Sequence, residues 1–295
     1  MKKNIPRRHH YIPQYYLKGF SVPENEKIWV YDKENKQKKP FNTNVKNAAV
    51  EKDFYKLNMY EGDDDTKSLE QYFANEIEGP TNPILNKIRE GKKIDRLEKY
   101  MLAYYMYSTI LRIPAAKEDA KKILPEVEKP ILEEAYQIID NYIKERPDQS
   151  KSNLQKAARG FIRAQIDNPS PIFMAPPKFP KILPVIMKMN WYFLCTTSDH
   201  FLTSDNPVFT HRASNGLLQG EFTFPVSKNI ALWATTHKKY FHDRSYQTIT
   251  PRMLKEINRR TVQNATRFVF SSKKESWINQ IVKKDKIEVR SALSS

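Results

Sequence analysis

Two short polar segments, one near each end of the chain, contain the residues best suited to chemistry. The first holds the adjacent His9 and His10, followed by Tyr11 and Gln14. An imidazole gains and loses a proton near neutral pH, so either histidine could act as a general acid or base. Neighbouring residues of a strand or helix point in different directions, which excludes a metal site made by these two histidines alone. The alternative is that this basic segment only packs the N-terminus against the core.

The second segment holds Ser204, Asp205 and Asn206, followed by Pro207, between two apolar runs. These residue types close turns with their own side chains, and a simple turn is one interpretation of the segment. The other is a site on a strand-supported loop, in which Asp205 is a base or a metal ligand and Asn206 donates its amide to a substrate. The spacing leaves both interpretations open.

A third candidate is Arg112, which ends a stretch of helical spacing just before Ile113 and Pro114. A cation at this position can satisfy the last carbonyls of the helix and its dipole. A guanidinium can also grip a phosphate or a carboxylate through two parallel hydrogen bonds. Three acidic residues are further candidates for ion pairing or metal coordination, or are simply solvated: Glu51, Glu70 and Glu78.

The composition favours a folded protein with an anionic partner. Hydrophobic residues make up 39% of the 295 residues, and the net charge is +16 with a pI of about 9.6. Such a charge favours binding to nucleic acid. The abundance of Lys, Asn, Ile and Tyr is also typical of AT-rich coding, which would give the charge without any functional demand. The sequence contains no phosphate-binding glycine loop, dinucleotide fingerprint, HExxH motif or nucleophile elbow, so nucleotide-fuelled and dinucleotide-dependent reactions are disfavoured.

The single cysteine and the absence of apolar segments indicate the cellular environment. Because Cys195 is the single cysteine, an intramolecular disulfide and a cysteine-based zinc site are excluded. The apolar neighbours of Cys195 predict that it is a packed strand residue. The N-terminus has no apolar stretch typical of a secretory signal, and no segment approaches the ~18 apolar residues of a membrane span. We therefore expect a cytoplasmic protein that does not bind membranes. The sequence leaves the oligomeric state undetermined.

The apolar pattern divides the chain into four regions: a mixed region over residues 1–65, a helical region over 66–166, a proline-rich crossing over 167–180 and a strand-rich region over 181–295. It predicts an α+β fold in a single domain over 1–295, with strand-containing ends packed together around an inserted helical layer. The expected helices cover 13–20, 66–78, 95–112, 116–144, 153–166 and 253–264, and Pro125 and Pro130 should interrupt the fourth. The expected strands cover 27–32, 53–57, 191–196, 201–203, 208–210, 221–226, 230–235 and 267–271.

The segment from His9 to Phe20, HHYIPQYYLKGF, and the segment from Phe201 to Val208, FLTSDNPV, together resemble a bacterial and phage family known as domain of unknown function 4238. The resemblance extends over nearly the whole chain and implies no established reaction. It does imply a site shared within the family, because its recurring segments are polar. The residues that the resemblance assigns to this site are His9, His10, Tyr11, Gln14, Arg112, Ser204, Asp205 and Asn206.

These observations lead to a hydrolase of phosphodiesters, most simply a nuclease in bacterial or phage conflict, as the leading hypothesis. One of the two histidines would be the general acid or base, with Asp205 as its partner or as a ligand of a divalent metal ion. Arg112 and Asn206, with Tyr11, Gln14 and Ser204 beside them, would hold the charged substrate. The alternatives are a non-enzymatic module that senses nucleic acid or another ligand, and a purely structural role for both segments.

Overall fold

The computed structural model describes residues 8–52, 54, 70–148, 150–167, 180–197, 199–213, 216–236 and 245–284. These residues form both helices and sheets, which confirms the predicted α+β class. Most of the expected strand 53–57 and of the proline-rich crossing 167–180 lies outside the described residues. Among the described helices, none combines the length and the apolar character needed to cross a bilayer.

A five-stranded sheet forms the centre of the larger core, in the order β10-β5-β9-β8-β7. Its strands are β5 (Asn190–Cys195), β7 (Phe209–Ala213), β8 (Gly216–Ser227), β9 (Ile230–Thr235) and β10 (Tyr246–Thr248). All pairs are antiparallel except β10 with β5. Every residue of β9 is buried, which is expected of a central strand covered on both faces. Cys195 is the last residue of β5, as its apolar neighbours predicted.

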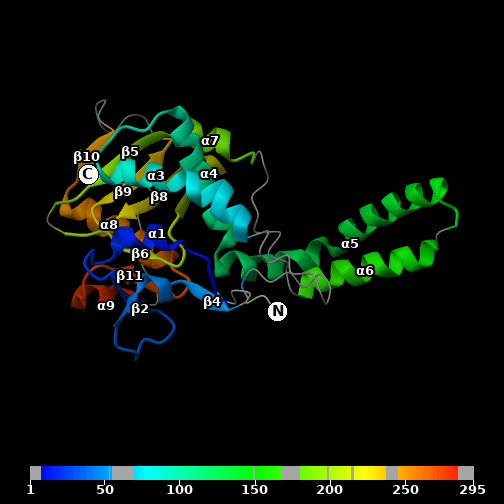
Figure 1. The fold of residues 1–295 in the computed structure, drawn as a ribbon, viewed down its shortest axis with the longest axis horizontal. Helices are drawn as coiled ribbons and strands as arrows, with labels where there is room; N and C mark the ends of the chain where they lie inside the picture. Colours follow the sequence, from blue (N-terminus) through cyan, green and yellow to red (C-terminus); the bar gives the residue numbers. More distant parts are fainter. Residues whose placement is uncertain are drawn as a thin grey trace, which may run out of the picture.

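Helices cover this sheet (Figure 1). They are α1 (Gln14–Leu17), which continues into a 3-10 turn (Lys18–Phe20), α3 (Gly79–Arg89), α4 (Arg96–Arg112) and α7 (Leu183–Lys188). Two of them, α3 and α4, belong to the helical region expected over 66–166. Tyr16 of α1 stacks on Phe224 of β8 at 5.2 Å, and Tyr105 of α4 meets the same ring edge-on at 6.1 Å. The start of α4 matches the prediction, because Asp95 and Glu98 form a capping box there.

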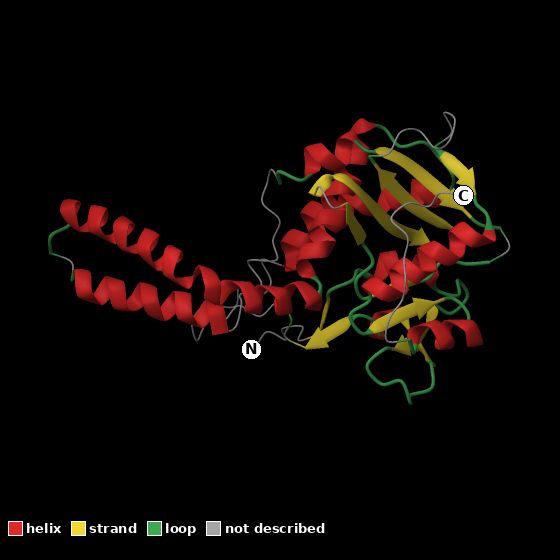
Figure 2. Cartoon of the chain, turned by 180° about the vertical axis from the view of Figure 1, so that it is seen from behind, coloured by secondary structure: helices red, strands yellow, loops and turns green. Residues whose placement is uncertain are grey.

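A second, four-stranded antiparallel sheet joins the two ends of the chain, in the order β3-β2-β11-β6. Its strands are β2 (Lys27–Asp32), β3 (Phe41–Asn44), β6 (Thr203–Ser204) and β11 (Phe268–Ser271). Two helices pack beside it, α8 (Pro251–Asn264) and α9 (Ser276–Val282). Asn258 of α8 bonds the backbone of Leu202, whereas Arg260 bonds Glu221 of β8, so α8 lies between the two sheets (Figure 2).

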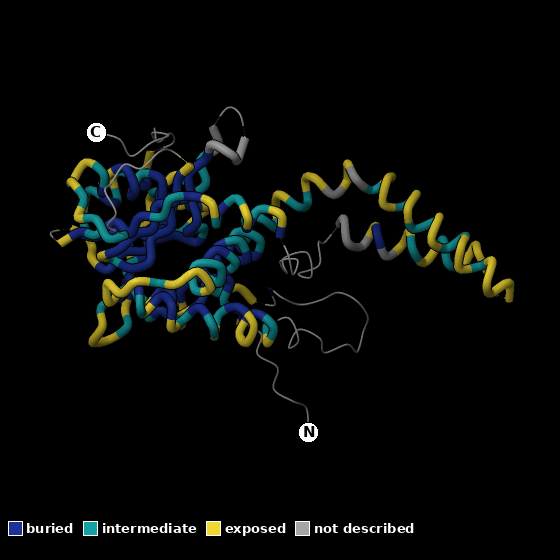
Figure 3. Tube along the Cα trace, turned by 90° about the horizontal axis from the view of Figure 1, so that it is seen from above, coloured by how far each residue is buried: buried dark blue, intermediate teal, exposed yellow. Residues whose placement is uncertain are grey.

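Three further features complete the fold. A ribbon pairs β1 (Arg8–His10) with β4 (Val50–Lys52), next to a 3-10 turn (Val45–Asn47), and a π-helix (Phe73–Glu78) leads into α3. The helices α5 (Pro114–Glu145) and α6 (Lys151–Asp167) form an arm that extends away from the body and is largely exposed (Figure 3).

The expected interruption of the arm at its prolines is wrong, because α5 continues through Pro125 and Pro130. A proline removes one backbone donor from a helix and strands the carbonyl four residues before it. These carbonyls belong to Lys121 and Glu126, which are half-exposed and exposed, so water can satisfy them. The remaining hydrogen bonds and the packing against α6 keep the helix continuous.

Candidate functional site

One face of the β1–β4 ribbon gathers a histidine and two cations. The register places Arg8 opposite Lys52, His9 opposite Glu51 and His10 opposite Val50. Because side chains alternate along a strand, Arg8, Lys52 and His10 share one face, and His9 points to the other. Arg8 and Lys52 are both exposed, and Arg8 Nη2 also donates to Asn47 Oδ1 at 3.1 Å. Like charges directly opposite each other destabilise an antiparallel pair, so this face is suited to an anion.

The half-buried His10 ring is fixed on this face by one hydrogen bond. The ring donates from Nε2 to the backbone carbonyl of Lys46 at 3.2 Å, which leaves Nδ1 as the basic nitrogen of the neutral ring. Burial lowers the pKa of His10 below its ordinary value, and the Arg8 guanidinium lowers it further. The bond to Lys46 and the carboxylate of Glu78 oppose this shift. The neutral form therefore predominates at neutral pH.

Glu78 is fixed by Arg112. Arg112 is fully buried, and its Nη1 donates to Glu78 Oε1 at 2.5 Å while the guanidinium lies 5.0 Å above the Phe73 ring. Phe73 and Glu78 begin and end the π-helix, a rare geometry that is frequent at functional sites. Burial raises the pKa of Tyr105 to about 12, with Arg112 lowering it and Glu78 raising it, so this hydroxyl stays protonated beside the pair.

The remaining residues of the first segment have other surroundings. His9 is buried, and its Nε2 lies 4.0 Å from Glu70 Oε2. Tyr11 is buried with its ring 5.6 Å from that of Phe54, and its backbone N–H donates to the Ala49 carbonyl. Gln14 is exposed at the first turn of α1. Substrate contacts by Tyr11 and Gln14 stay predictions, and the burial of Tyr11 disfavours one.

The second segment forms a turn whose carboxylate anchors the backbone. Asp205 is buried, and its Oδ1 accepts from the N–H of Thr266 at 2.8 Å, while Oδ2 accepts from those of Arg267 and Phe268 at 2.7 and 2.9 Å. Burial raises the pKa of Asp205 to about 6, against the lowering effect of these three bonds and of nearby Lys33. The carboxylate thus joins the loop after β6 to the start of β11.

The neighbours of Asp205 complete this turn. Ser204 is buried, and its hydroxyl donates to the Asn206 carbonyl at 2.8 Å. Asn264 Nδ2 donates to the same carbonyl at 2.7 Å and to that of Val208 at 3.1 Å. Arg112 therefore bonds Glu78, whose carboxylate raises the pKa of His10, whereas Ser204, Asp205 and Asn206 form a separate hydrogen-bonded group with the α8–β11 connection. A catalytic role for Asp205 stays a prediction that these contacts do not favour.

An aromatic cleft lies between the π-helix and α4. It has a volume of about 470 Å³ and is lined by Tyr72, Tyr100, Tyr104, Met101, Ile77, Thr81 and Glu76. The rings of Tyr100 and Tyr104 are nearly parallel, with an interplanar angle of 12°, and the hydroxyls of Tyr72 and Tyr104 are 3.1 Å apart. Glu76 belongs to the same π-helix as Glu78, the residue whose carboxylate raises the pKa of His10.

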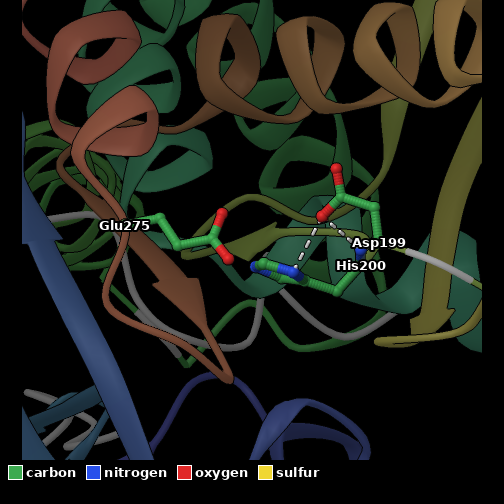
Figure 4. A group of neighbouring side chains, drawn as sticks. All are labelled: Asp199, His200 and Glu275. Atoms are coloured by element: carbon green, nitrogen blue, oxygen red, sulfur yellow. Dashed lines mark hydrogen bonds and ion pairs between the residues drawn. The ribbon is translucent and has the colours of Figure 1, made fainter.

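The structure also contains a third polar group, which was not predicted from the sequence and is made of Asp199, His200 and Glu275 (Figure 4). One donor atom of each residue lies within 4.8 Å of the other two. Glu275 is far in the sequence from the adjacent Asp199 and His200, and the three residues follow no known metal-ligand spacing. Only the adjacency of Asp199 and His200 could have attracted notice.

A buried ion pair was also missed. Arg260 Nη1 donates to Glu221 Oε2 at 2.8 Å and to Thr223 Oγ1 at 3.0 Å, and Trp233 Nε1 donates to the same carboxylate oxygen. Arg260 and Glu221 are almost inaccessible to solvent. This pair joins α8 to β8 inside the core, where it has the surroundings of a structural element.

Comparison with known proteins places the chain in one family. Residues 8–275 match the family model described as a protein of unknown function, DUF4238. The chain belongs to the DUF4238 family. No curated protein and no solved structure matches it. The matched region of DUF4238 includes the His10 face, the Arg112–Glu78 pair, the Asp205 turn and the Asp199–His200–Glu275 group.

Proposed function

We propose that this DUF4238 protein hydrolyses phosphodiester bonds in nucleic acid, with His10 as the general base. The observation that supports the proposal is the ribbon face on which Arg8 and Lys52 stand opposite each other beside His10. A phosphate between the two cations would offset their repulsion and would place its phosphorus near the imidazole. The net charge of +16 favours the same class of substrate.

In the proposed reaction, His10 accepts a proton from a water molecule whose oxygen attacks the phosphorus. A new phosphorus–oxygen bond forms, the bond to the leaving oxygen breaks, and that oxygen takes a proton from solvent. Arg112 acts as a positioning residue, because it is buried and holds Glu78. The Glu78 carboxylate then stabilises the imidazolium that forms, as its effect on the pKa of His10 indicates.

The aromatic cleft gives independent support for a nucleic acid substrate. Its tyrosine rings offer flat surfaces on which a base can stack, and base stacking on aromatic side chains contributes about 1–3 kcal/mol per base. Stacking is tolerant of sequence, so we expect a single-stranded substrate without strong sequence preference.

The test is cleavage of labelled single-stranded DNA, RNA and duplex DNA by the purified full chain, with Mg²⁺, with Mn²⁺ and with chelator. We expect cleavage of a single strand and a loss of at least about 100-fold in His10→Gln, since general base catalysis contributes about 10²–10⁴-fold. His211→Gln is the matched control, because His211 lies on β7 of the five-stranded sheet and not on the β1–β4 ribbon. Intact substrates under all conditions, or an undiminished rate in His10→Gln, would refute the proposal.

Binding without turnover is the second candidate function, and the same Arg8–Lys52 face supports it. A sensor would lose affinity in the double variant Arg8→Gln, Lys52→Gln but would keep it in His10→Gln. Its affinity would fall steeply with salt, because phosphate contacts release counterions. Equal affinity of the wild type and the double variant would contradict this function.

A further inference from the structure

The group formed by Asp199, His200 and Glu275 has the geometry of a cation site. Asp199 and His200 precede β6, and Glu275 precedes α9, so the group joins two segments that the fold brings together. Figure 4 shows the two carboxylates on either side of the imidazole. The group lies beside the second sheet and shares no residue with the proposed His10 site.

His200 is oriented as a ligand. The residue is 2% exposed, and its Nε2 lies 2.9 Å from Ser271 Oγ, which also accepts from the Lys273 N–H. Its Nδ1 is buried and has no hydrogen-bond partner among the described residues, although Asp199 Oδ1 is only 3.1 Å away. The lone pair or N–H of Nδ1 therefore does not point at that oxygen. Two ligands of one ion have this relation, because each points at the ion and not at the other ligand.

The same contacts could suggest a Ser–His–Asp nucleophile, since Ser271, His200 and Asp199 follow one another in space. Ser271 is fully buried in β11, so no substrate carbonyl can reach its hydroxyl. The bent approach of His200 to Asp199 also lacks the hydrogen bond that orients the imidazole in such a triad. Ser271 instead resembles the outer partner that fixes the ring of a metal-bound histidine.

We propose that Asp199, His200 and Glu275 bind one divalent transition-metal ion, with Zn²⁺ as the best fit. One imidazole nitrogen and two carboxylates suit zinc better than Mg²⁺ or Ca²⁺, which prefer oxygen ligands alone. With bonds of about 2.0–2.2 Å, tetrahedral zinc ligands lie roughly 3.3–3.6 Å apart. The 3.1 Å between Asp199 and His200 is close to this separation, and small side-chain rotations close the distances up to 4.8 Å.

The surroundings of the two carboxylates support this assignment. The Asp199 side chain is 47% exposed, so an ion can enter from solvent and keep a water molecule as its fourth ligand. Glu275 is oriented by Trp277, whose Nε1 donates to its Oε2, and by its own N–H, which donates to the Tyr31 hydroxyl. The bound ion would fasten the segment before α9 to the segment before β6.

The experiment is titration of the chelator-treated full chain with Zn²⁺ by isothermal calorimetry, with thermal unfolding in parallel. We expect one zinc ion per chain and a melting temperature that rises with zinc concentration. Asp199→Asn and Glu275→Gln should each weaken binding by at least about 100-fold, because even outer partners of metal ligands contribute 10–100-fold. Neither substitution alters the size of the side chain, so both variants should fold.

The control variants separate this site from other histidines. His211→Gln and His10→Gln should bind zinc as the wild type does. Absence of a stoichiometric heat in the wild type would overturn the proposal, as would unchanged affinity in both Asp199→Asn and Glu275→Gln. The proposal does not rest on the nuclease function, since zinc binding is measured without any substrate.

Discussion

The buried carboxylate of Asp205 makes the stability of the protein depend on pH in a defined direction. Burial opposes its ionisation, whereas three backbone N–H groups favour it, and burial prevails because the pKa rises from the ordinary 3.8 to about 6. The folded state therefore holds this proton more tightly than the unfolded state. The stabilisation from the neutral form is complete below pH 3.8 and is lost as the pH rises through about 6.

The size of this effect follows from the difference between the two pKa values. That difference corresponds to about 3 kcal/mol, because one pH unit is equivalent to about 1.4 kcal/mol. Asp205→Asn replaces the carboxyl by an uncharged group of similar shape and removes this dependence. The variant's free energy of unfolding minus that of the wild type should therefore be roughly 3 kcal/mol larger at pH 7.5 than at pH 3.5.

Urea unfolding of both proteins at the two pH values measures this difference, and the comparison cancels the titration of all other groups. The pKa of Asp205 can be read independently from the carboxyl carbon resonance. A difference in stability that does not change with pH would refute the reasoning. A reversed change would show that the three N–H donors outweigh burial and hold the pKa below 3.8.

Three further predictions follow from the site and the arm. Arg112→Met should lower the free energy of unfolding by about 3 kcal/mol. This value is at the lower end of the range for a broken buried ion pair, because Glu78 is 23% exposed. Lys121→Met, which removes an exposed pair with Glu118, should leave the urea midpoint unchanged. If His10 is the base, the rate should fall on the acid side with a midpoint below pH 6.5, and Arg8→Gln should move that midpoint upward, because Arg8 lowers the pKa of His10; a midpoint above 6.5 would contradict this. Replacing residues 129–162 by a short Gly-Ser turn should preserve the near-UV circular dichroism of the body, since the arm extends away from it; loss of that signal would show that the arm supports the core.

Much of the fold could be predicted from local patterns. The spacing of apolar residues predicted the helix 95–112 and the strand 27–32, and the structure has α4 at Arg96–Arg112 and β2 at Lys27–Asp32. These elements follow from periodicity because each buries one face, and the period of the apolar residues reports the secondary structure directly. The continuous α5 was missed, since a local rule for proline ignores the hydration and packing that keep an exposed helix intact.

The sequence alone determined which residue types are available for chemistry and that His9 and His10 cannot face the same way, because this depends only on the geometry of one backbone segment. The tertiary structure decided that His10 shares a face with Arg8 and Lys52, that Arg112 holds Glu78, and that Asp205 holds a backbone turn. It also assembled Asp199, His200 and Glu275. Contacts between residues far apart in the chain depend on how the sheets and helices pack, and no local spacing encodes that packing.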